Sequence, residues 1–453
     1  MLYARHNNRV SIPESTMLLS SRRDAGGAPL AEHALFDILN VKNLHFTDAV
    51  MNTRAFAILL LCVFCSLLGV GIVSPLLPLY ADAMGATGVL LGMIFSSFTM
   101  TRAIVIPFIG PLSDRRGRKL FLLIGFGGFT AATLGYILAT APLHLILTRA
   151  VQGATAGMML PIARAFIGDL CPPGQEGKWQ GIANAAFFGG FAVGPLIGGP
   201  IAEFYGYNTA FYFMGGICLL SFVLALLFLP ESGSRQSGGL RPSTKGLFRL
   251  LFTDRILGGL SFYRIALALG RGCFMVFLPL FAASSLDIGL GLIGVLLACH
   301  NMLRAVAQPY FGSLADRASR RSLVIIGAVS HIVFFLLIPW DYAYWQLLVL
   351  VAFGGVAAAV AMPALTALYT EQGRISGMGT SMSLDTFALA IGMGIGPILG
   401  GLVADALNVA SVFYFAAGVQ LAGIGLFAIL TRDYTSGARV ATVRHPPDIQ
   451  PPD

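Results

Sequence analysis

The sequence predicts an all-α membrane protein in which twelve transmembrane helices form two pseudo-symmetric six-helix bundles. The first observation is composition. Apolar residues make up 56% of the 453 residues and charged residues only 11%, whereas soluble domains contain about 25% charged residues. The second is a series of twelve apolar segments, each near the length of about 20 residues that spans a bilayer as a helix. The third is an internal repeat that relates the two halves of the chain.

The apolar segments divide the chain into spans and connections. Each segment is expected to be a helix, because lipid offers no hydrogen-bond partner to an unpaired backbone group. The predicted spans are 54–81, 87–113, 118–140, 142–169, 177–203, 208–230, 257–283, 287–314, 321–340, 343–370, 374–404 and 408–431. The expected parts of the chain are an N-terminal tail, taken as disordered (1–53), a first bundle (54–230), a central connection (231–256), a second bundle (257–431) and a C-terminal tail (432–453). Met51 directly precedes the first span, so a translation start at Met1 or at Met51 stays open.

The basic residues indicate how the spans are oriented. Six of the 29 Lys and Arg residues lie well inside predicted spans, and the remaining 23 lie in the tails, in connections or at span ends on one side. Because basic residues are retained on the cytoplasmic side, both tails and the central connection are predicted to be cytoplasmic, in a protein of the plasma (inner) membrane. The charged residues of the opposite connections are all acidic: Asp82, Glu203, Asp287, Asp341 and Asp405.

The two halves repeat at an offset of 202 residues, which places Gly92 on Gly294 and Asp114 on Asp316. Other pairs at this offset are Arg102 and Arg304, Pro107 and Pro309, Gly110 and Gly312, Arg118 and Arg320, Pro161 and Pro363, Asp169 and Glu371, and Gly194-Pro195 and Gly396-Pro397. Two parallel halves of this kind predict a ligand site near the bilayer midplane, where the halves meet.

The connection between spans two and three combines glycines with charges, in the pattern Gly-x-x-x-Asp-Arg-x-Gly-Arg-Lys. Glycine lets a helix end approach its neighbour, and a carboxylate can cap the positive N-terminal end of a helix in the other half. The arginines can donate charge-assisted hydrogen bonds to a nearby acid. We therefore expect a cytoplasmic latch that closes in one state and opens in another. Its first-half residues are Gly110, Asp114, Arg115, Gly117 and Arg118.

Span five is rich in glycine and contains a proline, which removes a backbone donor and bends the helix. Glycines on one face allow close packing against the other half, so this helix is expected to seal the extracellular side. A generic packing helix is the alternative. The motif residues are Gly181, Gly190, Gly194, Pro195, Gly198 and Gly199, and span eleven repeats part of the motif as Gly392, Gly396-Pro397 and Gly400-Gly401.

Both motifs resemble signatures of the major facilitator superfamily, and the span-five motif is similar to one that marks its exporters. A third element, Arg149-x-x-Gln152-Gly in span four, resembles the family's R-x-x-Q-G. The resemblance implies a transporter that works by alternating access, with spans one, four, seven and ten around its cavity. It also implies that Arg149 takes part in proton coupling, oriented by Gln152. An arginine that snorkels to the outer interface is the alternative.

The resemblance also implies an ion pair between the latch residue Arg118 and Asp169 at the end of span four. The repeat supplies a second latch from Asp316, Arg320 and Glu371. Here Ala318 and Ser319 replace the Arg and Gly of the first copy, so a looser second latch is expected. The chain departs from the family's drug exporters in one respect. Those proteins often carry an acid inside span one or four, and this chain has none at mid-depth there.

Ionisable residues inside spans are costly and mark candidate functional sites. Asp385 in span eleven is the only carboxylate well inside a predicted span, at a depth similar to that of Arg102 in span two. We predict an Arg102–Asp385 pair that forms in one state and parts in the other, with Asp385 as the proton site. A static ion pair is the alternative. The residues expected to line a substrate cavity are Arg149, Gln152, Arg264 and Arg271.

Two functions follow from these residues and the resemblance. The first is a proton-coupled exporter of small lipophilic or amphipathic molecules, and the second is an organic-anion carrier that uses the membrane arginines. The expected partners are a small-molecule substrate, protons and the lipid bilayer, with the protein as a monomer. The chain has no phosphate-cradling loop, metal-ligand pattern or nucleophile motif. It is therefore expected to be no enzyme and to bind no cofactor, metal or nucleic acid.

Overall fold

The computed structural model describes residues 30–172, 175–231, 254–340 and 343–432, and all regular elements in these ranges are helices. They are α1 (Leu30–Ala83), α2 (Gly88–Arg116), α3 (Arg118–Ile137), α4 (Pro142–Leu170), α5 (Glu176–Tyr205), α6 (Tyr207–Phe228), α8 (Arg255–Leu286), α9 (Leu290–Arg317), α10 (Arg320–Leu337), α11 (Tyr344–Ser376), α12 (Met378–Ala406) and α13 (Ser411–Leu430). Each contains an apolar stretch long enough to cross a membrane. The predicted all-α fold with twelve membrane-length helices is confirmed for this part of the chain.

The helix ends differ from the predicted spans mainly at two places. Helix α1 begins at Leu30, and its apolar span begins at Thr53. Helix α11 continues to Ser376, so the first residues predicted for span eleven belong to the preceding helix. Gly377, with φ of 102°, separates α11 from α12, because glycine adopts positive φ without steric cost. The rest of the predicted N-terminal tail, most of the central connection and nearly all of the C-terminal tail lie outside the described residues.

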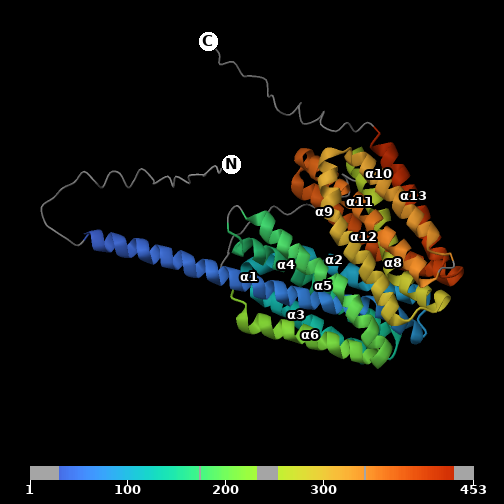
Figure 1. Ribbon diagram of the computed structural model, residues 1–453, viewed down its shortest axis with the longest axis horizontal. Helices are drawn as coiled ribbons and strands as arrows, with labels where there is room; N and C mark the ends of the chain where they lie inside the picture. Colours follow the sequence, from blue (N-terminus) through green and yellow to red (C-terminus); the bar gives the residue numbers. More distant parts are fainter. Residues whose placement is uncertain (1–29, 173–174, 232–253, 341–342, 433–453) are drawn as a thin grey trace, which may run out of the picture. The chain divides into compact units, whose positions relative to one another are not determined.

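Helices α2–α6 and helices α8–α13 form two groups (Figure 1). Within the first group α3 packs against α4 and α6, and within the second α8 packs against α12 and α13. Between the groups, α2 packs along α12 and α5 packs along α9. The internal repeat maps one of these contacts onto the other, because α2 corresponds to α9 and α5 corresponds to α12. The repeat therefore describes the tertiary structure as well as the sequence.

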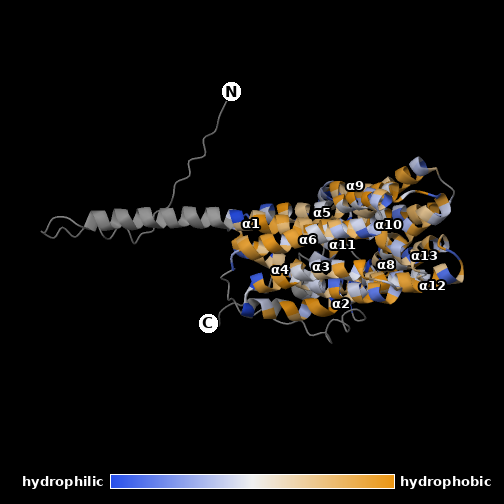
Figure 2. Cartoon of the chain, turned by 90° about the horizontal axis from the view of Figure 1, so that it is seen from below, coloured by the Kyte–Doolittle hydropathy of each residue, from blue (hydrophilic) through white to orange (hydrophobic). Residues whose placement is uncertain are grey.

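The two ends of the helices differ in charge, and hydrophobic residues cover most of their length between the ends (Figure 2). The end that carries the α2–α3 and α9–α10 connections contains Arg118, Lys119, Arg320 and Arg321, and we call it the basic side. The opposite end carries the α1–α2 and α8–α9 connections and contains Asp82, Glu203, Asp287 and Asp405, and we call it the acidic side.

The glycines of the span-five motif bring helix backbones together. A Cβ atom on Gly190 would lie 2.5 Å from the carbonyl oxygen of Phe64, and one on Gly194 or Gly198 would meet Gly71 or Ile72. All three contacts are with residues of α1 that belong to the predicted first bundle, as α5 does. The sequence had predicted packing against the other half, and that is wrong for these positions, because helical periodicity does not reveal which neighbour a face meets.

Two other motif residues do reach the other bundle. A Cβ on Gly199 would lie 2.5 Å from the carbonyl oxygen of Leu290 in α9, and the carbonyl of Pro195 lies against Gly294. Gly181 has no heavy atom within 4 Å of the position that a Cβ would take. The motif therefore combines packing within the first bundle with a contact between the bundles at its acidic-side end.

Candidate functional site

A cavity of about 1070 Å³ lies between the two bundles. Its walls come from α1, α2, α4, α5, α8 and α12, with α2 and α12 contributing the largest share. Spans one, four and seven line it as expected, whereas the tenth span, α11, lines a smaller neighbouring pocket. The contribution of α2 and α12 was missed, because these helices both face the cavity and join the bundles.

The cavity wall is largely apolar, and its charged lining residues in the described part of the chain are all arginines. Phe95, Phe98, Phe191 and Phe387 contribute rings. The charged lining residues are Arg102, Arg149 and Arg271, and no carboxylate of the described residues lines this cavity. Such a surface can bind an amphipathic molecule through its apolar body and can attract negative charge.

Arg149 is held among aromatic rings inside the first bundle, and the residue is 4% exposed. Its guanidinium lies 5.1 Å from the ring centre of Phe95 and 5.6 Å from that of Phe98. Its Nη1 donates a 3.0 Å hydrogen bond to Oε1 of Gln152, which also accepts one from the hydroxyl of Tyr136. Cation–π contacts and an amide therefore stabilise the charge, and the side chain does not snorkel to an interface.

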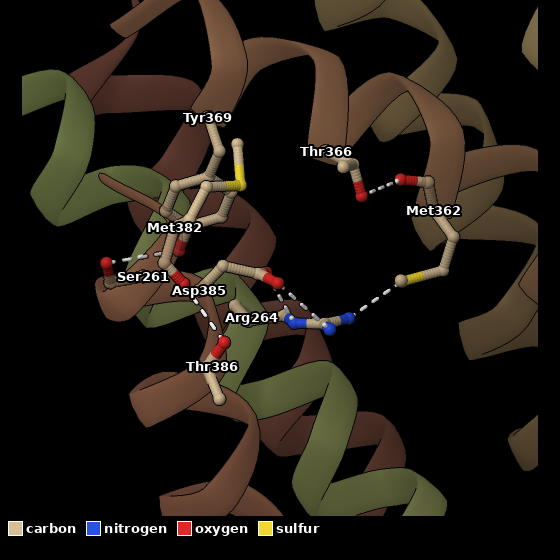
Figure 3. A network of polar contacts seen from close by, with 8 residues as sticks. All are labelled: Ser261, Arg264, Met362, Thr366, Tyr369, Met382, Asp385 and Thr386. Carbon is tan, nitrogen blue, oxygen red and sulfur yellow. Dashed lines mark hydrogen bonds and ion pairs between the residues drawn. The ribbon is translucent and has the colours of Figure 1, made fainter. Parts of the chain in front are cut away.

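Asp385 forms an ion pair with Arg264 inside the second bundle (Figure 3). Nε of Arg264 lies 2.8 Å from Oδ1 of Asp385, and Nη2 donates a 3.5 Å hydrogen bond to Oδ2. The other side of the guanidinium points to Met362, with Nη1 2.7 Å from the sulfur. The side chain of Arg264 is 7% exposed and that of Asp385 19%, so the pair is screened from bulk solvent.

The predicted partner of Asp385, Arg102, is not its partner in this conformation. Among the described residues, the ion pair of Asp385 is with Arg264 alone, and Arg102 lines the central cavity. The reason is the orientation of α12, which turns Asp385 toward α8 of its own bundle. The predicted spans put both residues at similar depth, but α12 begins only at Met378 and α2 continues to Arg116, so Asp385 lies nearer the basic-side helix end than Arg102. The rotation about the helix axis is not visible in an apolar sequence.

The basic side contains ion pairs that stay within each bundle. Nη1 of Arg118 lies 2.8 Å from Oδ2 of Asp169, in the first bundle. In the second bundle Arg320 pairs with Glu371 and lies 3.8 Å from Asp316. The sequence placed both pairs correctly. The side chains of the other latch residues Gly110, Asp114 and Arg115 lie outside the described part of the structure.

The two copies of the α2–α3 connection differ in backbone conformation. Gly117 alone joins α2 to α3, with φ of 92°, which favours glycine. In the second copy two residues, Ala318 and Ser319, join α9 to α10, and the Ser319 hydroxyl accepts a hydrogen bond from the Ser322 amide. The longer connection needs no positive φ, which explains why serine can replace glycine there.

On the acidic side, carboxylates of one bundle cap helices of the other. Asp405 at the end of α12 accepts hydrogen bonds from the backbone amides of Gly88 (2.6 Å) and Val89 (2.9 Å) at the start of α2. Glu203 at the end of α5 accepts a 2.6 Å hydrogen bond from the amide of Gly291 at the start of α9. The two acids are 202 residues apart, so the caps are related by the repeat. The sequence analysis missed them, although the offset of the two acids was a readable signal.

Close backbone contacts accompany these caps. Gly92 of α2 lies against Pro397 of α12, and its counterpart Gly294 of α9 lies against Pro195 of α5. Gly401 likewise meets the backbone of Gly88. We call the two caps and these glycine contacts the acidic-side junction. It joins the bundles at the end of the cavity where Pro397 forms part of the wall.

Comparison with known proteins places this architecture in a family. The sequence profile of the Major Facilitator Superfamily matches residues 59–268 and 260–449. The chain therefore belongs to this superfamily of membrane transporters and is not an enzyme. Its twelve apolar helices make it an integral membrane protein.

Two curated relatives match over most of their length. An uncharacterised major-facilitator-type transporter, MJ1560 of Methanocaldococcus jannaschii, is 28% identical over 358 residues, which cover 78% of this chain and 92% of the relative. The quinolone resistance protein NorA of Staphylococcus aureus is 27% identical over 387 residues, which cover 84% of this chain and 97% of NorA.

Solved structures share the fold at low sequence identity. A bacterial homologue of the human lysosomal transporter Spinster, in an inward-facing conformation, superposes with a TM-score of 0.69 at 14% identity, covering 84% of this chain and 96% of that one. A point mutant of the nucleoside transporter NupG superposes with a TM-score of 0.71 at 14% identity, covering 83% of this chain and 99% of that one.

Proposed function

We propose that this protein exports small amphipathic molecules from the cytoplasm across the plasma membrane and takes up protons in exchange. The similarity to the quinolone resistance protein NorA supports drug-like substrates and the export direction. The largely apolar cavity between the bundles supports amphipathic substrates. In this proposal the basic side faces the cytoplasm, as the distribution of Lys and Arg suggests.

The observation that carries the proposal is the pair of Asp385 and Arg264 next to the cavity. Asp385 supplies the proton site, because a carboxylate can lose its charge by binding one proton. Its neighbours along α12, Thr386 and Leu389, line the cavity. A substrate that binds at this wall therefore lies close to Asp385, whose charge changes when it binds a proton.

The position of α12 suggests how the proton would act on the whole molecule. Protonation removes the charge that attracts Arg264 and weakens the contact between α12 and α8. Helix α12 also carries Asp405 and Pro397, which hold it to α2 of the other bundle. A shift of α12 is thus transmitted to the acidic-side junction. On the basic side we propose that the latch residues close across the bundles in the opposite state.

The test is substrate-driven proton movement in inverted vesicles or proteoliposomes, with wild type, Asp385→Asn and the control Asp287→Asn. Asp287 lies in the α8–α9 connection with φ of 51°, a conformation that asparagine tolerates. Addition of a lipophilic drug should move protons in wild type and in the control. Asp385→Asn should bind the drug and move no protons. Unchanged proton movement in Asp385→Asn would contradict the proposal.

A second function, transport of organic anions, is favoured by the arginines of the cavity wall. Arg102, Arg149 and Arg271 line a cavity that has no acid among its described lining residues. Under this alternative, Arg271→Gln should abolish the flux of an anionic substrate and leave that of a neutral drug unchanged. Flux of an anionic substrate that persists in Arg271→Gln would contradict this second function. Proton movement driven by a neutral drug in wild type would favour the exporter.

A further inference from the structure

A small pocket lies beside the central cavity, inside the second bundle between α8, α9, α10, α11 and α12. Its volume is about 30 Å³, and a water molecule needs about 10–15 Å³ measured in this way. The pocket therefore has room for one small polar group. Arg271 and Leu389 line both this pocket and the large cavity, so the two spaces share a wall.

Three guanidinium groups line this pocket, those of Arg264 and Arg271 on α8 and of Arg304 on α9. We call them the arginine triad. No carboxylate of the described residues lines this pocket. The carboxylate of Asp385 neutralises one member only, so the triad keeps an excess of positive charge.

Two members of the triad have donors to spare. In the part of the chain that the structure describes, neither Arg271 nor Arg304 makes a hydrogen bond or ion pair with a protein acceptor, whereas Arg264 contacts both Asp385 and Met362. A guanidinium carries five N–H donors and no acceptor. Uncompensated charge in a membrane interior costs several kcal/mol per ion, and an acceptor with negative charge is what these groups lack.

The remaining walls fit the same ligand. The ring of Phe274 packs 4.5 Å from that of His300 and makes one wall apolar. His300 and His331 also line the pocket, and they are 6% and 5% exposed. Nδ1 of His300 lies 3.3 Å from the carbonyl oxygen of Val351, and Nδ1 of His331 lies 2.9 Å from Oε1 of Gln420. Their rings are therefore held in place, and the pocket is preformed.

We propose that the arginine triad binds an anionic group, a carboxylate, sulfonate or phosphate head or a free inorganic anion. An amphipathic anion would place its head in the small pocket and its apolar body in the large cavity, passing between Arg271 and Leu389, which border both spaces. This inference rests on the proposed transport of amphipathic molecules and names the chemistry of one end of the substrate. It does not depend on the direction of transport or on proton coupling.

The test is equilibrium binding of two fluorescent probes to the purified full-length protein in lipid nanodiscs. The anionic probe is 8-anilinonaphthalene-1-sulfonate, and the neutral probe is N-phenyl-1-naphthylamine, which has the same rings without the sulfonate. The variants are Arg271→Gln and Arg304→Gln, with Arg304→Lys as the conservative change. The control is Arg164→Gln, which removes an arginine of α4 that lines neither pocket.

We expect each glutamine variant to weaken binding of the sulfonate probe about tenfold or more, a change of about 1.4 kcal/mol. Binding of the neutral probe should stay within about twofold in every variant that elutes as a single species. Arg304→Lys should recover part of the affinity, and Arg164→Gln should bind both probes like wild type. Equal loss of both probes, or unchanged binding of the sulfonate, would overturn the proposal.

The source of the anion is decided by replacing gluconate, whose hydroxylated chain does not match the apolar wall of the large cavity, with chloride. Competition by chloride that disappears in Arg304→Gln would assign the pocket to a free inorganic anion. Unchanged probe binding in chloride would assign it to the head group of an organic substrate. Binding is measured without a gradient, so a failure of proton exchange in Asp385→Asn leaves this result intact, and the two proposals can fail separately.

Discussion

Contacts on the acidic side cross between the two bundles, whereas two ion pairs among the described side chains of the basic side each join helices of one bundle. The junction joins α2 to α12 and α5 to α9 through backbone contacts and the carboxylates of Asp405 and Glu203. The pairs Arg118–Asp169 and Arg320–Glu371 each join helices of a single bundle. Each side therefore stabilises the molecule by a different means.

The two sides therefore differ in how strictly they depend on the residue at each position. A backbone contact requires glycine at a given position, because any side chain would separate the helices. An ion pair between long side chains tolerates small shifts of the backbone, because the side chains can follow by changing rotamer. The junction should therefore be the more sensitive side to single substitutions. Three predictions test this. All use the same measurement, the rate at which a cysteine on the cavity wall is labelled. The cysteine is introduced as Ser74→Cys in a background without other cysteines.

The largest effect is expected from Gly92→Val. A Cβ at this position would lie 2.6 Å from the carbonyl carbon of Pro397, so α2 and α12 must separate, at a cost of about 1–3 kcal/mol for overpacking. Labelling of Ser74→Cys by a membrane-impermeant maleimide from the acidic side should rise roughly tenfold, with transport lost. Gly216→Val is the matched control, because nothing lies within 4 Å of the Cβ position there. Equal labelling in the two variants would contradict the role assigned to the contact.

An intermediate effect is expected from Asp405→Asn and Glu203→Gln. Each change removes a charged acceptor from the start of a helix in the other bundle, and such caps contribute about 0.5–2 kcal/mol. Labelling should rise a few-fold in each variant. The two effects should add in the double variant, because the caps lie at separate helix ends. Asp82→Asn changes an acid on the same side that takes part in neither cap, and this variant should label like wild type.

The smallest effect on labelling is expected from Arg118→Gln and Arg320→Gln. Both ion pairs lie on the basic side, and each joins helices of one bundle. Because changes at distant sites act almost independently, acidic-side labelling should change by less than about twofold. Lys178→Gln, an exposed basic residue of α5, is the control. A large increase in labelling for either arginine variant would mean that these pairs also hold the bundles together. That result would contradict the difference between the two sides.

Several features of the candidate site were predictable and others were not. The pair of Arg118 with Asp169 was implied by the resemblance to the family, and the internal repeat extended it to Arg320 and Glu371. The contact of Gln152 with Arg149 follows from their spacing on one helix. The partner of Asp385 was missed, since an apolar helix shows no polar face from which its rotation can be inferred. The arginine triad was missed in part, because Arg304 lies on a different helix from Arg264 and Arg271.

The sequence by itself determined the twelve apolar spans of the described residues, most of their ends to within a few residues, and the relation between the two halves. It could do so because backbone groups in lipid must be paired within their own segment, so hydropathy and length define each span locally. Only the tertiary structure decided which face of each helix meets which neighbour. That choice turned Asp385 toward Arg264, placed the span-five glycines against α1 and gathered three arginines around one pocket. These outcomes depend on packing between segments far apart in the chain, which no local pattern records.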